Sequence, residues 1–292
     1  MLSSISDFER ITVTAPDGLS LAGELCGRAD APLVLLLHGG GQSRSAWRGA
    51  ARRLAEAGYR ACIIDIRGHG DSDWSDQLRY SFDDYVGDVI ATISAIGGPA
   101  ALVGASLGGH IAMLCAARYP EHITHLALAD VTPWIDETEG DAMRAALRKS
   151  AEGFATVEEA ADAIAEMRGT PMRGGSLDKL RRRLDLREDG RLYWQWDVRL
   201  MNDQLLRGGG EGGLFRREAE RLGMPVLVMR AEHSTLTTQE EIDAFRAVKP
   251  DLQQVVIAGA GHMVSGDVND AYAEAILNFL PAAKACCPPE TL

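Results

Sequence analysis

The stretch ALVGASLGGHIAMLCAARY, residues 101–119, decides the fold class of this 292-residue chain. A short apolar run at 101–103 leads into G-A-S-L-G at 104–108, and a segment with helical composition follows. The pattern G-x-S-x-G between a strand and a helix is typical of a tight turn that exposes a serine above a sheet edge, and its glycines avoid Cβ clashes. Ser106 is therefore predicted to be a nucleophile. The alternative is a glycine-rich turn with an incidental serine.

Strand-like apolar runs and helical segments alternate on both sides of this turn. The continuous apolar runs are typical of parallel strands buried on both faces, and only the first two strands are expected to form a hairpin, at Pro16-Asp17-Gly18. The alternation predicts an α/β fold with a mostly parallel, doubly wound sheet of about eight strands and helices on both faces. The expected strands are 11–14, 19–25, 33–37, 61–66, 101–103, 123–129, 226–229 and 254–257, and the expected helices are 45–57, 82–96, 107–119, 239–248 and 268–280.

The alternation stops between residues 131 and 222. This segment is rich in charge, lacks a strand-like apolar run and contains a capping box at Thr156 and Glu159, so it is predicted to be helical. We expect residues 1–130 and 223–281 to form the core, and residues 131–222 to form a cap or lid over the Ser106 edge of the sheet. Residues 282–292 are expected to be a loose tail.

Composition and motifs exclude several classes of function. The net charge of −12 disfavours nucleic acid as a partner. The five cysteines include no C-x-x-C pair, and neither a phosphate loop nor an H-E-x-x-H motif is present, so no metal and no cofactor are expected. Residues 1–10 do not resemble a secretory signal, and no apolar stretch approaches the ~20 residues of a membrane span. We expect a cytoplasmic protein. The sequence does not determine its oligomeric state.

A serine hydroxyl needs a base before it becomes a nucleophile. His262 follows the last expected strand in the sequence Gly261-His262-Met263, so it should lie at the same sheet edge as Ser106. His262 is therefore the predicted general base, and the alternative is a surface histidine. His69, in the loop after the strand at 61–66, is predicted to be structural.

Together these motifs resemble the α/β-hydrolase superfamily. They are His38-Gly39-Gly40, D-I-R-G-H-G-D-S at 65–72, the Ser106 turn and Gly261-His262, within residues 33–120 and 225–280. The match is nearest to the bacterial serine esterase and lactonase branch, whose members are often labelled epoxide hydrolase or peroxidase. Epoxide hydrolases carry Asp where this chain has Ser106, which disfavours that activity.

The resemblance also implies the groups around the nucleophile. An oxyanion hole would use the N–H groups of Leu107 and Gly40, unless the glycines at 39–41 form only a flexible turn. Two roles stay open for the aromatic residues of the cap: they line the expected substrate pocket, or they form the core of the cap itself. The residues expected to line that pocket are Gly39, Trp134, Trp194, Trp196 and Met263.

The acid of the triad is where the chain departs from the family pattern. Relatives usually carry Asp in the loop after the strand at 226–229, but this loop reads R-A-E-H-S-T-L at 230–236. Glu232 is its only carboxylate and is the expected acid. The first alternative is Asp130, at the end of the strand at 123–129. The second alternative is that the chain has no functional acid.

The resemblance implies a cofactor-independent serine hydrolase that cleaves a small carboxylic ester or lactone. Ser106 would form an acyl-enzyme, with His262 as the general base. Three alternatives remain: a C–C bond hydrolase, a perhydrolase on the same scaffold, and a ligand receptor without catalytic activity.

Overall fold

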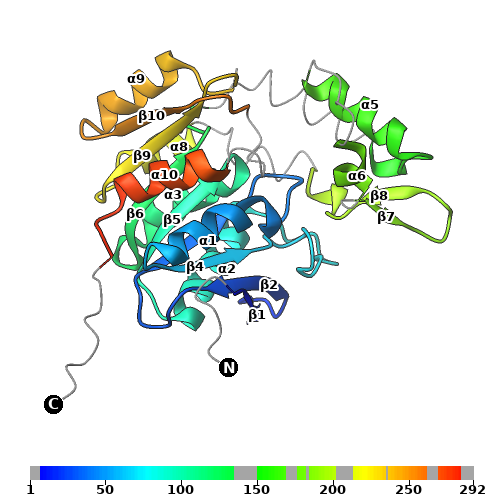
Figure 1. The fold of residues 1–292 in the computed structure, drawn as a ribbon, viewed down its shortest axis with the longest axis horizontal. Coiled ribbons are helices and arrows are strands. Elements are labelled where there is room, and N and C mark those ends of the chain that lie inside the picture. Colours follow the sequence, from blue (N-terminus) through cyan, green and yellow to red (C-terminus); the bar gives the residue numbers. More distant parts are fainter. Residues whose placement is uncertain are drawn as a thin grey trace.

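An eight-stranded sheet runs through the centre of the molecule (Figure 1). The computed structural model describes residues 7–134, 150–168, 176–181, 184–201, 213–234, 236–261 and 269–283. Neighbouring strands are parallel except at the start of the chain, where β2 is antiparallel to both of its neighbours. Across the sheet the strands are β1 (Glu9–Thr14), β2 (Ser20–Cys26), β4 (Arg60–Ile64), β3 (Leu33–Leu37), β5 (Ala100–Ala105), β6 (Ile123–Ala129), β9 (Val226–Ala231) and β10 (Gln253–Ile257).

The central strands form because their sequences are apolar on both faces. Every residue of β3 and β5 is buried, whereas the edge strands β1 and β10 keep exposed positions. Buried runs of this kind need helices on both sides of the sheet. The α/β fold predicted from the sequence is therefore confirmed.

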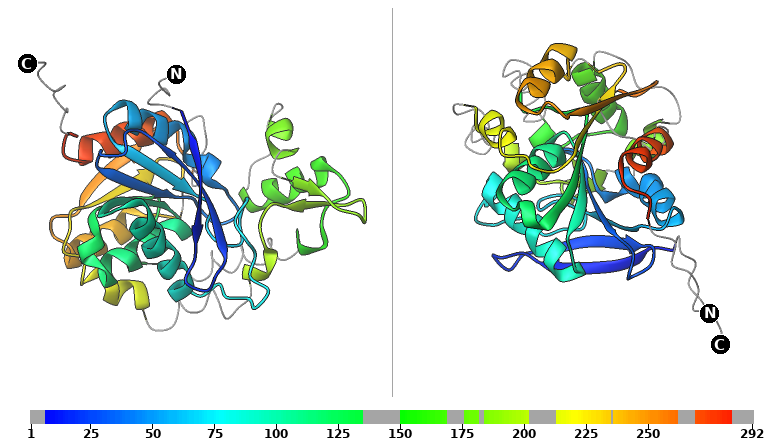
Figure 2. Two further views of the ribbon diagram at one scale, coloured as in Figure 1. Left: turned by 90° about the horizontal axis from the view of Figure 1, so that it is seen from below. Right: turned by 90° about the vertical axis from the view of Figure 1, so that its left-hand side faces the viewer.

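Helices cover the two faces in separate groups (Figure 2). On one face, α1 (Arg48–Glu56) packs against α10 (Asn269–Phe279). On the other face, α3 (Leu107–Arg118) lies between α2 (Phe82–Ile96) and α8 (Leu214–Ala219), and α9 (Gln239–Val248) joins the same apolar cluster. The short 3-10 helices of the core are η1 (Arg44–Trp47) and η2 (Pro120–His122). This arrangement places the N-terminus of α3, and with it Ser106, at the carboxyl edge of the parallel strands.

The insertion forms a smaller lobe beside the core (Figures 1 and 2). Its described elements are η3 (Ser150–Glu152), α5 (Val157–Arg168), α6 (Ser176–Arg181), β7 (Leu184–Leu186), β8 (Leu192–Trp194) and η4 (Val198–Met201). Thr156 caps α5 as predicted, since its Oγ1 accepts the Glu159 N–H at 3.1 Å.

The insertion is not wholly helical, because β7 and β8 form an antiparallel hairpin. Each strand is only three residues long, and Asp185 interrupts the apolar residues of β7, so neither strand has the apolar run that marks a strand in the sequence. A tertiary contact stabilises it, since Phe154 pairs with Leu192 through two backbone hydrogen bonds of 2.8 Å. The end of the segment, α8, packs on α3 of the core.

Candidate active site

The Ser106 turn has the backbone geometry that the glycine pattern predicts. Ser106 lies between β5 and α3 with φ +47° and ψ −116°, in a region that residues other than glycine rarely adopt. A Cβ atom on Gly104 would lie 2.3 Å from the Gly108 carbonyl oxygen, and one on Gly108 would lie 2.5 Å from the His38 carbonyl oxygen. Glycine at both positions is therefore a steric requirement of the close approach between β3, β5 and α3.

Ser106 and Asp130 follow paired positions of two neighbouring strands. Ala105 and Ala129 are register partners, and the Ser106 N–H donates to the Ala129 oxygen at 3.3 Å. Asp130 also has a left-handed backbone, with φ +52°, and its N–H donates to the Met229 oxygen at 2.9 Å. The nucleophile candidate and one acid candidate therefore lie at the same sheet edge, one strand apart.

The loop after β3, here called the glycine loop, contains Gly39, Gly40 and Gly41. It lies against the Ser106 turn. A Cβ atom on Gly39 would lie 3.5 Å from the Ser106 Cβ, and one on Gly40 would lie 3.9 Å from the Leu107 Cβ. Leu107 opens α3, where a helix leaves its N–H groups without intrahelical partners. The loop and the helix start therefore meet beside the serine.

Hydrogen bonds of this loop leave one of its N–H groups available. The Gly39 N–H donates to Gln42 Oε1 at 3.0 Å, and the Gly41 N–H donates to His69 Nε2 at 3.1 Å. Within the described residues, the Gly40 N–H has no such partner. The Gly39 carbonyl accepts from the Gln42 N–H and from His38 Nδ1, so the planar peptide directs the Gly40 N–H the opposite way.

Two buried and uncharged histidines hold this loop in place. His38 Nε2 accepts the Ile66 N–H at 3.0 Å, so its Nδ1 carries the proton that is donated to the Gly39 oxygen at 2.8 Å. His69 Nδ1 donates to the Arg67 oxygen at 3.1 Å. Burial lowers the pKa of His38 to about 4 and that of His69 to about 3. The structural role predicted for His69 agrees with this geometry.

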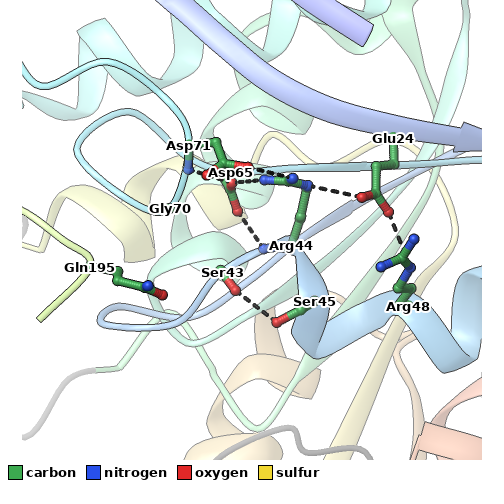
Figure 3. Close-up of a pocket in the computed structure, with 9 residues that line it drawn as sticks. All are labelled: Glu24, Ser43, Arg44, Ser45, Arg48, Asp65, Gly70, Asp71 and Gln195. Atoms are coloured by element: carbon green, nitrogen blue, oxygen red, sulfur yellow. Dashed lines mark hydrogen bonds and ion pairs between the residues drawn. The ribbon is translucent and has the colours of Figure 1, made fainter. Parts of the chain in front are cut away.

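A charged cluster anchors the far end of the glycine loop (Figure 3). The fully buried Asp65 carboxylate accepts the Arg44 N–H at 2.6 Å and the Asp71 N–H at 2.9 Å, and it forms an ion pair with the Arg44 guanidinium. The D-I-R-G-H-G-D-S motif supplies both aspartates, but nothing in the sequence identified Arg44, 21 residues before Asp65, as their partner.

Beside this cluster is a small polar pocket of about 160 Å³. Figure 3 shows Gln195 of the insertion facing Arg44 across it. Ser106 does not line this pocket, which therefore flanks the candidate site rather than forming it. Its lining residues are Glu24, Ser43, Arg44, Ser45, Arg48, Asp65, Gly70, Asp71 and Gln195.

The two candidate acids lie in different surroundings. The Asp130 side chain is buried, and its Oδ1 accepts the Ala231 N–H at 3.0 Å. The Glu232 side chain is 49% exposed, and its Oε2 accepts the Gly259 N–H at 2.7 Å in the turn after β10. Ser106 is thus one strand from Asp130 and two strands from the loop that carries Glu232.

The three tryptophans expected in the pocket lie in three different places. Trp194 is buried in the insertion, where its ring centroid is 5.2 Å from that of Phe154. Trp134 is half-buried just after Asp130, under the Arg216 guanidinium at 5.4 Å. Trp196 is buried over the glycine loop. Only Trp134 and Trp196 therefore lie next to segments of the candidate site.

Two predicted site residues, His262 and Met263, lie outside the described residues. In the part of the chain that is described, no three His, Cys, Asp or Glu side chains are grouped to hold a metal ion. None of the helices described is both long enough and apolar enough to cross a membrane.

Comparison with known proteins agrees with this geometry. Residues 32–267 match the family described as alpha/beta hydrolase fold. The 2-(acetamidomethylene)succinate hydrolase of Mesorhizobium japonicum is 27% identical over 87% of this chain and 90% of its own length. An esterase of Mycobacterium tuberculosis is 26% identical over 94% of this chain and 90% of its own length.

Solved structures show the same likeness. The crystal structure of E-2-(acetamidomethylene)succinate hydrolase has a TM-score of 0.80 at 26% identity, over 94% of this chain and 99% of that one. A thioesterase domain from the curacin biosynthetic pathway, at 23% identity, has a TM-score of 0.74 over 93% of this chain. With its sheet order, its Ser106 turn and a family match over most of its length, the chain belongs to the α/β hydrolase family.

Proposed function

We propose that this hydrolase cleaves carboxylic esters or lactones through an acyl-enzyme on Ser106, with His262 as the general base. The observation that carries the proposal is the Ser106 backbone, whose φ of +47° lies in the left-handed region. Such strain costs about 1–3 kcal/mol and persists mainly at functional sites. Glycine would remove the strain from a turn that served only the fold.

The chemistry follows from the groups around this turn. Ser106 Oγ would attack the carbonyl carbon while His262 takes its proton. The N–H groups of Gly40 and Leu107 would stabilise the oxyanion, and His262 would protonate the departing alkoxide. Water, activated by His262, would then hydrolyse the acyl-enzyme. Each oxyanion donor of this kind contributes about 3–4 kcal/mol to the transition state.

For the acid that orients His262 we favour Asp130 over Glu232. Burial makes the charge of Asp130 act through a medium of low dielectric constant, and the Ala231 N–H fixes one of its oxygens. The half-exposed Glu232 carboxylate is screened by water and already accepts the Gly259 N–H. Asp130 follows β6, which is next to the strand before Ser106, whereas Glu232 follows β9, which is one strand further away. This order supports the same choice.

One observation favours a second substrate class. The Mesorhizobium relative, which acts on 2-(acetamidomethylene)succinate, matches nine-tenths of its length to this chain. That compound is an amide with two carboxylates. The same nucleophile and oxyanion hole can open an amide, so an acylamino dicarboxylate is the alternative substrate.

The test is hydrolysis by wild type and Ser106→Ala in parallel. The substrates are p-nitrophenyl esters from acetyl to decanoyl, several lactones and 2-(acetamidomethylene)succinate, with products identified by mass spectrometry. Wild type should turn over an ester or lactone and react with a fluorophosphonate probe. Ser106→Ala should lose roughly 10⁴- to 10⁶-fold in kcat and should not be labelled.

Other outcomes separate the alternatives. Equal rates in the two proteins, or a wild type that neither turns over nor reacts with the probe, would reject the serine mechanism. Turnover of the amide alone would keep the mechanism and change the substrate class. Carbon–carbon cleavage products would identify a different hydrolase on the same scaffold.

A further inference from the structure

The cap residues 195–197 are joined to the core on both sides of Trp196. The Gly70 N–H donates to the Gln195 oxygen at 2.8 Å, and the Asp197 N–H donates to the Gly68 oxygen at 2.7 Å. The buried Asp197 carboxylate also accepts the Tyr80 hydroxyl. The segment is thus held by an isolated antiparallel β-bridge, between Trp196 and His69, to the loop that carries His69.

Trp196 connects this segment to the glycine loop. Its indole ring lies nearly parallel to the His69 ring, with centroids 6.2 Å apart and an interplanar angle of 20°. A Cβ atom on Gly41 would lie 3.4 Å from Trp196 Nε1, so the indole also covers Gly41. Trp196 itself is 3% exposed. The indole therefore shields the bond between the Gly41 N–H and His69 Nε2 from water.

The contacts continue from His69 to the peptide that carries the Gly40 N–H. The rings of His69 and His38 meet edge to face with centroids 5.0 Å apart. His38 holds the Gly39 carbonyl, and His69 holds the Gly41 N–H. Gly40 lies between these two fixed points, so a shift of the His69 ring would reach the Gly40 N–H through the Gly41 peptide on one side and the His38 ring on the other.

We propose that Trp196 is a positioning residue for the oxyanion hole. With residues 195–197 on the core, Trp196 holds His69 and Gly41 so that the Gly40 N–H faces the reacting carbonyl. This inference rests on the proposed function of Ser106. It gives Trp196 a role distinct from lining the substrate pocket, and it makes cap docking a condition of transition-state stabilisation.

The experiment compares Trp196→Leu with a matched cap variant, Phe154→Leu. Phe154 is also a buried aromatic of the cap, but it packs on Trp194 and not on His69. Trp196→Phe retains a ring that can stack on His69. For each protein we would measure kcat and KM on the best p-nitrophenyl ester, the Ki of a trifluoromethyl ketone that forms a tetrahedral oxyanion, and the Tm.

Trp196→Leu should lower kcat roughly 10- to 100-fold, a part of the 10²- to 10³-fold loss that follows removal of a whole donor. Its KM should stay within about threefold, and the ketone should bind weaker by the same factor as kcat. Trp196→Phe should restore most of kcat. Phe154→Leu should lower the Tm and leave kcat close to wild type.

Three results would overturn the inference. A raised KM with unchanged kcat in Trp196→Leu would make Trp196 a wall of the substrate pocket. An equal loss of kcat in Phe154→Leu would reduce the effect to general loosening of the cap. An unchanged kcat would exclude any role in the oxyanion hole. If Trp196→Leu does not fold, Trp196→Met fills the same space without a flat ring and must show the same split.

The dependence of turnover on Ser106 distinguishes failure of the proposed function from failure of the Trp196 inference. Wild-type turnover that does not depend on Ser106 would reject the serine mechanism, and the inference with it. Wild-type turnover that depends on Ser106, combined with a normal kcat in Trp196→Leu, would reject the inference alone.

Discussion

The loops that follow β3 and β9 lie on opposite sides of the Ser106 strand and are held in different ways. The first is fixed by buried side chains, since Gly41 bonds to His69 and Arg44 to Asp65. The second is held in part by exposed contacts, such as that of Glu232 with Gly259. Buried polar networks fix geometry, whereas exposed ones tolerate change. We therefore infer that the geometry of the candidate site is fixed more firmly on the side of the loop that follows β3, called the β3 side below, than on the side of the loop that follows β9.

The largest expected effect tests whether the β9 loop contributes a catalytic group at all. Asp130→Asn should lower kcat about 10⁴-fold, because the amide cannot stabilise the imidazolium that forms on His262. Glu232→Gln should stay within about threefold of wild type, since the side chain is half-exposed. Both are measured on the ester that wild type turns over best. The opposite ranking would assign the acid to Glu232 and remove the contrast between the loops.

A second pair of variants compares the stability that each loop contributes. Asp65→Asn leaves the nearly buried Arg44 guanidinium without its closest counter-charge. It should lower the free energy of unfolding by about 3 kcal/mol or more. Glu232→Gln, on the β9 loop, should cost less than about 0.5 kcal/mol. Urea unfolding followed by circular dichroism measures both, and equal costs would contradict the ranking.

A third prediction concerns how stability on the β3 side depends on pH, where each histidine contributes a small change per pH unit. His38 and His69 have folded-state pKa values of about 4 and about 3, whereas the unfolded chain has about 6.5. Below pH 6.5 the unfolded state therefore binds protons that the folded state does not. The stability that these histidines contribute is complete above pH 6.5 and falls on acidification, by up to about 1.4 kcal/mol per pH unit for each.

Urea unfolding between pH 7.5 and 4.5 measures this slope. His69→Phe should make it shallower, because one buried histidine is gone. His233→Gln, on the exposed β9 loop, is the matched control and should leave the slope as in wild type. A slope that His69→Phe does not change would mean that other groups cause the acid sensitivity.

Sequence patterns were sufficient wherever a structure depends on local chemistry. The strands of the parallel sheet follow from continuous apolar runs, and the Ser106 turn follows from glycines that any larger residue would block. The β7–β8 hairpin was missed because its three-residue strands depend on the contact with Phe154. The anchoring of Arg44 by Asp65 was missed because only folding brings the two together. Burial, which separates Asp130 from Glu232, cannot be read from either loop sequence.

The strand order also determines when the site is completed during synthesis. Strands β1 to β6 are contiguous in the sheet and are made first, and β9 and β10 then add to one open edge without entering between existing strands. Chains fold from the N-terminus as they emerge from the ribosome. The Ser106 turn, the glycine loop and Asp130 can thus assemble before the cap and the segment with His262 exist. A nascent chain at that stage would carry the proposed nucleophile Ser106 without Trp196 to orient the Gly40 N–H and without His262, so under the proposed mechanism it stays inactive until both segments have been made.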